Sequence, residues 1–316
     1  MARGQGGAGP ARLRGRARDG RRPPRDPDRA GAARDAAARG VSVPDWEDPR
    51  RVLGRYGLAP KKKFSQSFLV SRHAVDAIAR ALAPRPDEQT VELGPGLGTL
   101  TGALLREGAR VLAIDADPQM LEVLQQELGH VEQLSLMHGD AANVDLAGLA
   151  AAHGPVALAG NLPYAITGAI LSNLCAHRHA LSRAVIMVQK EVRDRLLADP
   201  GNKTYGALTV FVQAGFRVEP VVKVPSGAFH PPPKVDSAVV KLTPLDPPRA
   251  EETEDFRAVV RAAFQQRRKT LRNSLKKLGV EADMFAHAGI DPTRRPETLS
   301  VEELAALTLA WSAARG

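Results

Sequence analysis

Residues 91–98 read Val-Glu-Leu-Gly-Pro-Gly-Leu-Gly, and this stretch decides the fold. Its apolar start predicts the end of a buried strand, and its three glycines predict a tight turn. Leu100, Ala103 and Leu104 follow at helical spacing. Glycines let a ligand approach the backbone closely, and the N-terminus of a helix offers free N–H groups. The stretch therefore predicts a strand–turn–helix unit that cradles a nucleotide.

Two more strands are expected after this unit, and each leads to a carboxylate. Residues 111–115 read Val-Leu-Ala-Ile-Asp, so Asp115 lies 21 residues after Gly94. From that position a carboxylate accepts hydrogen bonds from ribose hydroxyls. Residues 134–137 lead through His-Gly to Asp140, whose carboxylate can accept the amine of an adenine. The alternative for Asp140 is a helix N-cap.

The glycine spacing narrows the choice of nucleotide. Dinucleotide-binding proteins carry the pattern Gly-x-Gly-x-x-Gly, whereas residues 94–98 read Gly-x-Gly-x-Gly. No glycine is present where a pyrophosphate would press against the helix. This spacing favours a ligand that has an adenosine but no diphosphate, such as S-adenosylmethionine.

A further apolar run, residues 156–159, leads to Asn161-Leu162-Pro163-Tyr164. Pro163 turns the backbone at the end of a predicted parallel strand, where open α/β folds place ligands. The Asn161 side-chain oxygen and the Leu162 carbonyl are expected to converge beside the ring of Tyr164. Two acceptors and a stacking ring suit a planar base with an exocyclic amine. The alternative is an ordinary loop with a half-buried tyrosine.

Two other segments carry aromatic residues that suit a nucleic acid. Phe229 is followed by a histidine and three prolines, and this stiff loop can hold its ring out as a stacking surface. The alternative is a connector with a buried phenylalanine. Two phenylalanines are preceded by three lysines, Lys61, Lys62 and Lys63. Clustered cations of this kind bind the phosphates along a nucleic-acid backbone. The alternative is a solvated run before a hydrophobic staple.

The remaining pattern predicts more strands and then only helices. Apolar runs at 184–188, 218–224 and 235–242 predict strands, and the three prolines of residues 243–249 predict a linker. Residues 256–280 contain eight lysines and arginines and no acid, which favours a phosphate-binding surface over a merely solvated face. The candidate RNA contacts there are Arg267, Arg268, Lys269 and Arg272.

The formal charge of +9 is concentrated at the N-terminus. Residues 1–40 contain 11 arginines and 4 aspartates but no aromatic residue, so the rest of the chain is nearly neutral. Such a composition cannot bury enough apolar surface to fold, so we expect a disordered basic tail over residues 1–44. An RNA-binding arm and an over-long translation start are both open readings of it. The aspartates disfavour a mitochondrial transit peptide.

The cysteine content and the lack of long apolar segments limit where in the cell the protein is expected to act. Cys175 is the one cysteine, so an intramolecular disulfide and a cysteine metal cluster are excluded. No apolar run approaches the roughly 18 residues of a membrane span, and the N-terminus lacks the apolar core of a secretory signal. The sequence predicts a cytoplasmic protein with no metal site and no membrane contact.

From residue 61 to residue 278 the chain resembles the ribosomal RNA adenine N6,N6-dimethyltransferases of the small-subunit (16S) type, the kasugamycin-resistance family. The segments that carry the resemblance are 64–69, 92–96, 161–164, 189–191, 229–237 (Phe-His-Pro-Pro-Pro-Lys-Val-Asp-Ser) and 264–274 (Phe-Gln-Gln-Arg-Arg-Lys-Thr-Leu-Arg-Asn-Ser). The related 23S adenine methyltransferases that confer macrolide resistance share the glycine loop but usually not the last two segments.

The resemblance implies a fold and a domain organisation. Residues 45–246 would form a Rossmann-like α/β methyltransferase domain with a mostly parallel seven-stranded sheet. Residues 250–316 would form a small all-α C-terminal domain that binds RNA.

The resemblance also implies site residues. S-adenosylmethionine would be held by Ser67, Leu69, Gly94, Gly96, Asp115, Asp140 and Asn161. The catalytic set would be Asn161, Leu162, Tyr164 and Phe229. The chain departs from the family pattern at three of its positions: Ser67 replaces a usual asparagine, Asp115 a frequent glutamate, and Ala165 a usual asparagine.

The expected activity is transfer of methyl groups from S-adenosylmethionine to N6 of two adjacent adenosines in a hairpin loop near the 3′ end of 16S rRNA. A monomer would act in this way during biogenesis of the small ribosomal subunit. Positioning would supply most of the rate, with no strong general base. Three alternatives stay open: a 23S methyltransferase that confers macrolide resistance, a non-catalytic ribosome-assembly factor, and an NAD-dependent oxidoreductase. The glycine spacing disfavours the last.

Overall fold

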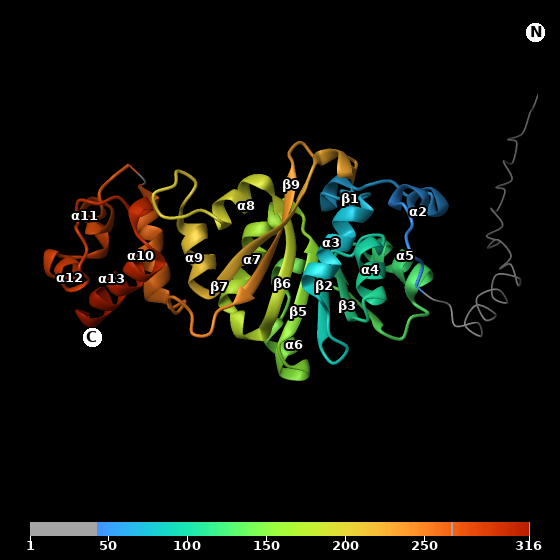
Figure 1. Cartoon of the computed structure of the whole chain (residues 1–316), viewed down its shortest axis with the longest axis horizontal. Helices are drawn as coiled ribbons and strands as arrows, with labels where there is room; N and C mark the ends of the chain where they lie inside the picture. The colour runs from blue at the N-terminus through green and yellow to red at the C-terminus, as the bar shows by residue number, and fades with distance from the viewer. Residues whose placement is uncertain (1–42, 267, 316) are drawn as a thin grey trace, which may run out of the picture. The chain divides into compact units, whose positions relative to one another are not determined.

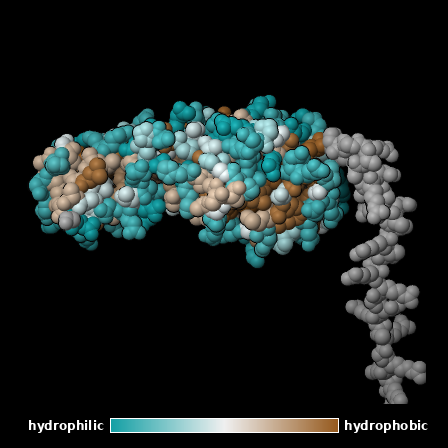
Figure 2. Space-filling model, turned by 90° about the horizontal axis from the view of Figure 1, so that it is seen from below, coloured by the Kyte–Doolittle hydropathy of each residue, from teal (hydrophilic) through white to brown (hydrophobic). Residues whose placement is uncertain are grey.

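The computed structural model describes residues 43–266 and 268–315. Most of the predicted basic tail (residues 1–42) and the predicted RNA contact Arg267 lie outside the described residues. Within the described part, no helix is both long and apolar enough to cross a membrane. The face shown in Figure 2 is mostly hydrophilic, with apolar residues gathered in limited areas.

Seven strands of the described chain form one sheet in the order β4-β3-β2-β5-β6-β9-β7 (Figure 1). The strands from β4 to β6 are parallel, whereas β9 runs antiparallel to both of its neighbours. Their bounds are β2 Gln89–Leu93, β3 Arg110–Asp115, β4 Leu134–His138, β5 Val156–Asn161, β6 Leu181–Gln189, β7 Phe216–Val224 and β9 Ser237–Pro244. The predicted mostly parallel seven-stranded sheet is confirmed.

Helices cover both faces of this sheet. Side chains on β5 alternate between the two apolar cores: Ala157 and Ala159 face α3, α4 and α5, whereas Val156 and Leu158 face α6 and α7. This double burial explains the continuous apolar runs in the sequence. The helices are α2 Pro49–Tyr56, α3 Arg72–Leu82, α4 Thr99–Arg106, α5 Pro118–Leu128, α6 Leu146–His153, α7 Thr167–Ala176, α8 Lys190–Leu196, α9 Ala207–Gly215, α10 Glu254–Gln265, α11 Leu271–Leu275, α12 Ala282–His287 and α13 Val301–Ala313.

The strand order places a crevice beside β2. The chain moves outward from β2 to β3 and β4 on one side, and from β5 to β6 on the other. Open α/β folds bind ligands outside the carboxyl ends of the strands at such a switch point. Gly160 permits this close pairing, because a Cβ atom there would lie 2.7 Å from the carbonyl oxygen of Leu93.

The C-terminal helices share a third apolar core with α9. The rings of Phe211 and Phe256 meet edge to face at 6.4 Å, and Tyr205 lies 6.0 Å from Phe264. By their contacts, the residues described here form one unit. The division into domains at residues 246–250 therefore stays a prediction.

Candidate active site

A cavity of about 380 Å³ opens where β2, β3 and β5 end. Every residue that the sequence predicted for catalysis or cofactor binding lines it. These residues are Ser67, Leu69, Gly94, Gly96, Asp115, Asp140, Asn161, Leu162, Tyr164 and Phe229. Segments that are far apart in the chain thus meet at one site.

The glycine loop, residues 94–98, lines this cavity through its residues 94–97. Gly94, Gly96 and Gly98 have φ values of 68°, 55° and 81°, in the left-handed region that side chains disfavour. A Cβ atom on Gly96 would also lie 3.1 Å from the ring of Phe68. The loop therefore needs glycine both for its backbone conformation and for close packing.

Asp115 is held in place by backbone amides. Its Oδ2 accepts a hydrogen bond from Gly96 N at 3.1 Å, and its Oδ1 accepts one from Asp117 N at 2.8 Å. Burial raises the pKa of this carboxyl above its ordinary value. Each oxygen retains a second lone pair, so the oriented carboxylate can still accept from two neighbouring hydroxyls.

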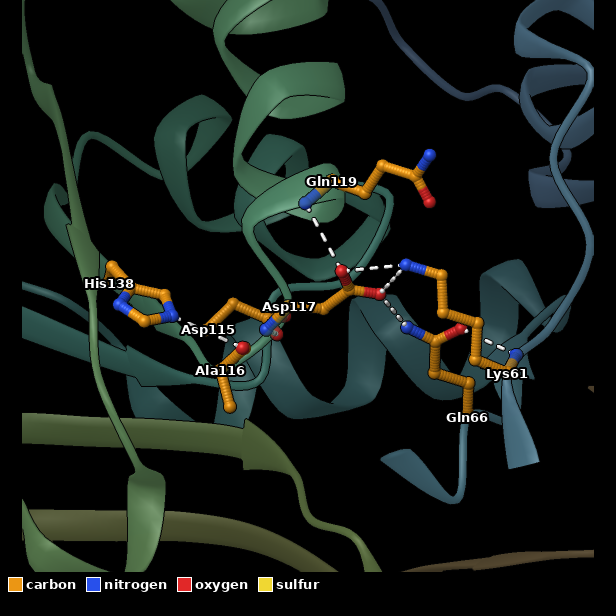
Figure 3. Close-up of polar contacts among 7 residues, drawn as sticks. All are labelled: Lys61, Gln66, Asp115, Ala116, Asp117, Gln119 and His138. Atoms are coloured by element: carbon orange, nitrogen blue, oxygen red, sulfur yellow. Dashed lines mark hydrogen bonds and ion pairs between the residues drawn. The ribbon is translucent and has the colours of Figure 1, made fainter. Parts of the chain in front are cut away.

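Asp117 is the centre of a polar cluster beside the cavity (Figure 3). Its side chain is 1% exposed and accepts hydrogen bonds from Lys61 Nζ at 2.9 Å and Gln66 Nε2 at 2.8 Å. It also caps the N-terminus of α5 by accepting a hydrogen bond from Gln119 N. The ammonium group of Lys61 is thus paired with a buried carboxylate, whereas Lys62 and Lys63 are exposed.

Asn161 has its side-chain amide oriented by one hydrogen bond. Its Nδ2 donates to the carbonyl oxygen of Ser67 at 3.1 Å. Among the described residues, none donates to its Oδ1 or to the carbonyl oxygen of Leu162. The turn therefore presents two acceptors beside the cavity.

Aromatic residues complete the wall of the cavity. Tyr164 is half-buried, and its hydroxyl is hydrogen-bonded to Ser237 Oγ at 2.5 Å. Phe229 pairs with Leu69 where strand β8 (Phe229–His230) meets β1 (Phe68–Leu69). The Phe229 side chain is only 4% exposed, so the proline-rich loop does not hold it out in solvent; its ring lines the cavity from within.

Asp140 caps a helical turn and also reaches the cavity. Its Oδ1 accepts from Ala142 N at 3.0 Å, and its Oδ2 accepts from Asn143 Nδ2 at 2.8 Å. The capping alternative is therefore observed. The side chain is exposed and lines the cavity, so capping leaves it accessible to a ligand.

Glu92 is a site residue that the sequence analysis used only as part of a motif. Its side chain lines the cavity, is 1% exposed, and has an Oε2 atom with no hydrogen-bond partner in the described part of the chain. Burial raises its pKa to about 8, and the charge of Asp115 adds to the increase. The sequence offered one signal for this role, which was a glutamate near the end of an otherwise apolar strand. A carboxylate in a buried strand is itself buried, and burial raises its pKa.

Of the predicted RNA contacts that the structure describes, only Lys63 lines the cavity. Arg268, Lys269 and Arg272 are exposed around the start of α11, with no ion pair to any described residue. In contrast, Arg257 of the same basic segment is paired with Glu252 at 3.1 Å. The uncompensated charge is therefore concentrated at the C-terminal part of the segment.

The cavity suits S-adenosylmethionine. Asp115 and Asp140 offer acceptors for a ribose and an adenine, and the glycine loop gives close access to the backbone. A Rossmann-like sheet with this loop and these strand-end carboxylates defines an S-adenosylmethionine-dependent methyltransferase.

Comparison with known proteins shows which family of methyltransferases the chain belongs to. The sequence model of the ribosomal RNA adenine dimethylase family matches residues 57–311, so the chain belongs to that family. It is similar to the ribosomal RNA small subunit methyltransferase A of Myxococcus xanthus, with 47% identity over 83% of this chain and 94% of the relative.

Solved structures agree with this assignment. The fold is similar to that of a dimethyladenosine transferase from Plasmodium falciparum, with a TM-score of 0.68, 27% identity, and coverage of 78% of this chain and 98% of that one. The 23S rRNA methyltransferase ErmE gives a TM-score of 0.60 at 27% identity, covering 78% of this chain and 99% of its own.

Proposed function

We propose that this protein dimethylates N6 of two adjacent adenosines in a hairpin loop near the 3′ end of small-subunit rRNA. The observation that carries this proposal is the oriented amide of Asn161. Its Nδ2 is engaged by Ser67, so Oδ1 is left to accept, next to the Leu162 carbonyl, to which none of the described residues donates. Two acceptors side by side match the two N–H groups of an adenine amine.

The cofactor would be held by the glycine loop and by the two strand-end carboxylates. Asp115 would accept the ribose hydroxyls, and Asp140 would accept the adenine amine. Ser67, Leu69, Gly94 and Gly96 would enclose the remainder. When bound, S-adenosylmethionine supplies an electrophilic methyl group on its sulfonium.

Asn161 and Leu162 would activate the target amine by position. The lone pair of an adenine amine is conjugated with the ring, which makes it a weak nucleophile. Hydrogen bonds from its N–H groups to Asn161 Oδ1 and to the Leu162 carbonyl would draw the nitrogen towards tetrahedral geometry and aim its lone pair. Such alignment supplies a large share of the rate without a general base.

Tyr164 and Phe229 would hold the extruded base. Enzymes that act on a base remove it from the stack and grip it between aromatic side chains. Both rings line the cavity that holds Asn161, and the Tyr164 ring is fixed through its hydroxyl. Their roles are those of stacking surfaces, because Phe229 has no ionisable group and the Tyr164 hydroxyl is engaged by Ser237.

We infer that RNA is bound by two exposed basic groups, Lys62 with Lys63 and Arg268 with Lys269 and Arg272. The second group supports a helical RNA-binding domain from residue 250 onward. Relatives that are 43% to 47% identical to this chain bear the name ribosomal RNA small subunit methyltransferase A, which favours that substrate over 23S rRNA. A monomer acting in the cytoplasm fits this role.

The direct test is methylation of purified small and large subunits by the protein and its Asn161→Ala variant. We expect the wild-type protein to place two methyl groups on each of two adjacent small-subunit adenines. Asn161→Ala should abolish incorporation while S-adenosylhomocysteine affinity stays within several-fold. Incorporation into the large subunit alone would refute the proposed substrate, and an active Asn161→Ala variant would refute the proposed mechanism.

A further inference from the structure

The segment of residues 61–69, here called the strap, lines the cavity with residues 63–69 and is held by contacts at both of its ends. Lys61 is paired with the buried Asp117 at 2.9 Å. At the other end, Phe68 and Leu69 pair with β8, and Ser67 Oγ donates to the carbonyl oxygen of Pro231 at 2.7 Å. The strap is therefore part of the cavity wall and not a free loop.

The oxygen and the nitrogen of the Gln66 side-chain amide both form hydrogen bonds, and these bonds hold the middle of the strap. Its Oε1 accepts from the backbone N–H of Lys61 at 2.9 Å, and its Nε2 donates to Asp117 Oδ2 at 2.8 Å. Figure 3 shows this amide lying between Lys61 and Asp117. The preceding residue, Ser65, has φ of 50°, a conformation that persists only where surrounding contacts maintain it.

A continuous polar connection runs from Asp115 through Gln66 to Asn161. Asp117 donates its backbone N–H to Asp115 Oδ1 and accepts from Gln66 with its side chain. The residue after Gln66 is Ser67, whose carbonyl oxygen receives Asn161 Nδ2 at 3.1 Å. The carboxylate on the ribose side and the amide on the base side are thus connected by these three hydrogen bonds and the peptide bond between Gln66 and Ser67.

We propose that Gln66 is a positioning residue that couples the cofactor side of the cavity to the base side. It holds the Ser67 carbonyl where that oxygen fixes the Asn161 amide with Oδ1 towards the adenine. This inference rests on the roles proposed above for Asp115 and Asn161. It applies most strongly to the second methylation, because monomethylated N6 retains one N–H and so has one hydrogen bond fewer to align it.

The same substitution at two glutamines tests the proposal. Gln66→Glu replaces the donating amide by a carboxylate that faces Asp117. Gln119→Glu makes the same charge change at the start of α5, but the Gln119 side chain points away from Asp117, which it contacts only through its backbone N–H (Figure 3). Gln66→Ala removes both hydrogen bonds without adding charge, and serves if Gln66→Glu folds poorly.

The measurements are kcat and KM on small subunits, the ratio of mono- to dimethyladenosine by mass spectrometry, S-adenosylhomocysteine affinity, and the thermal midpoint. We expect the Gln66 variants to lose about tenfold or more in kcat per folded molecule, because small misplacements of reacting groups have effects of this size. Their product should shift towards monomethyladenosine. Gln119→Glu should retain the wild-type rate and product ratio.

Two results would overturn the inference. One is a Gln66 variant with the wild-type kcat and product ratio. The other is a decrease in activity that disappears when activity is divided by the folded fraction, which would make Gln66 a purely structural residue. If the wild-type protein itself methylates no adenine, the proposed function fails instead, so the two failures are distinguishable.

Discussion

The hydroxyl of Tyr164 is hydrogen-bonded to that of Ser237, which joins the Asn-Leu-Pro-Tyr turn to the first residue of β9. Ser237 is buried, so the bond has little competition from water. Burial also raises the pKa of Tyr164 above its ordinary value, which keeps the phenol protonated at neutral pH. The hydrogen bond links two of the segments that carry the family resemblance, 161–164 and 229–237, and fixes the plane of a ring at the cavity wall.

Removing this bond should reduce turnover modestly. Tyr164→Phe keeps the ring but removes an orienting hydrogen bond of about 1 kcal/mol, so we expect kcat to fall roughly fivefold. Tyr164→Ala removes the stacking surface and should reduce kcat much further. Methylation rates at saturating RNA measure both effects.

Ser237→Ala provides the matched control, because it removes the same bond from the other partner. The double variant Tyr164→Phe with Ser237→Ala should be no slower than either single variant. Additive decreases in rate would show that the two hydroxyls act independently and would contradict this interpretation.

The buried carboxyl of Glu92 should make stability depend on pH. Its folded pKa of about 8 lies above the ordinary value of 4.5. The folded state therefore binds the proton more tightly than the unfolded state. The stabilisation is complete below about pH 4.5 and is lost as pH rises to about 8, by at most about 1.4 kcal/mol per pH unit.

Glu92→Gln keeps the shape of the side chain and removes its ionisation. Relative to this variant, the wild-type protein should lose free energy of unfolding between pH 5 and pH 8, as measured by urea denaturation. Glu122→Gln, at an exposed position on α5, should show no such difference. If the free energy of unfolding of the wild-type protein differed from that of Glu92→Gln by the same amount at every pH, the assignment would be wrong.

The glycine loop can be tested at a position where conformation and packing can be separated. Gly96→Ala adds a methyl group at φ of 55° that also meets the Phe68 ring, so the loop must move and S-adenosylhomocysteine affinity should fall at least about tenfold. Gly108→Ala has the same conformational penalty at φ of 84°, but nothing lies near its Cβ. It should reduce stability by about 1 kcal/mol and leave affinity unchanged, as calorimetry can establish.

Much of this site was accessible from the sequence because its parts are local motifs. The strand before Gly94 was predicted from a run of a few residues, and the structure confirms it. The N-caps at Ser71 and Asp117 and the capping box of Ser300 and Glu303 are likewise formed within a few residues of chain. Since parallel strands end at one edge of the sheet, the motifs at their ends had to converge. Strand-end position therefore predicted which residues line the cavity.

Interactions between distant segments were not predictable in this way. The sequence presented Lys61 as one of three equivalent cations, but the fold pairs it with Asp117, 56 residues later. The orientation of Asn161 by Ser67 joins residues that are 94 positions apart in the chain. No periodicity or spacing records such partners, because they are set by how the strap packs against the completed sheet.

The three lysines of the strap should consequently differ in effect. Lys62→Ala with Lys63→Ala should weaken RNA binding and reduce the slope of log K against log salt concentration by about 1 for each phosphate that is no longer neutralised. The thermal midpoint should not change, because both side chains are exposed.

Lys61→Ala should instead lower the midpoint, because it removes a partner from a buried carboxylate. RNA binding measured from about 50 to about 200 mM salt, together with thermal unfolding, separates the two effects. Equal behaviour of all three lysines would contradict the division of roles.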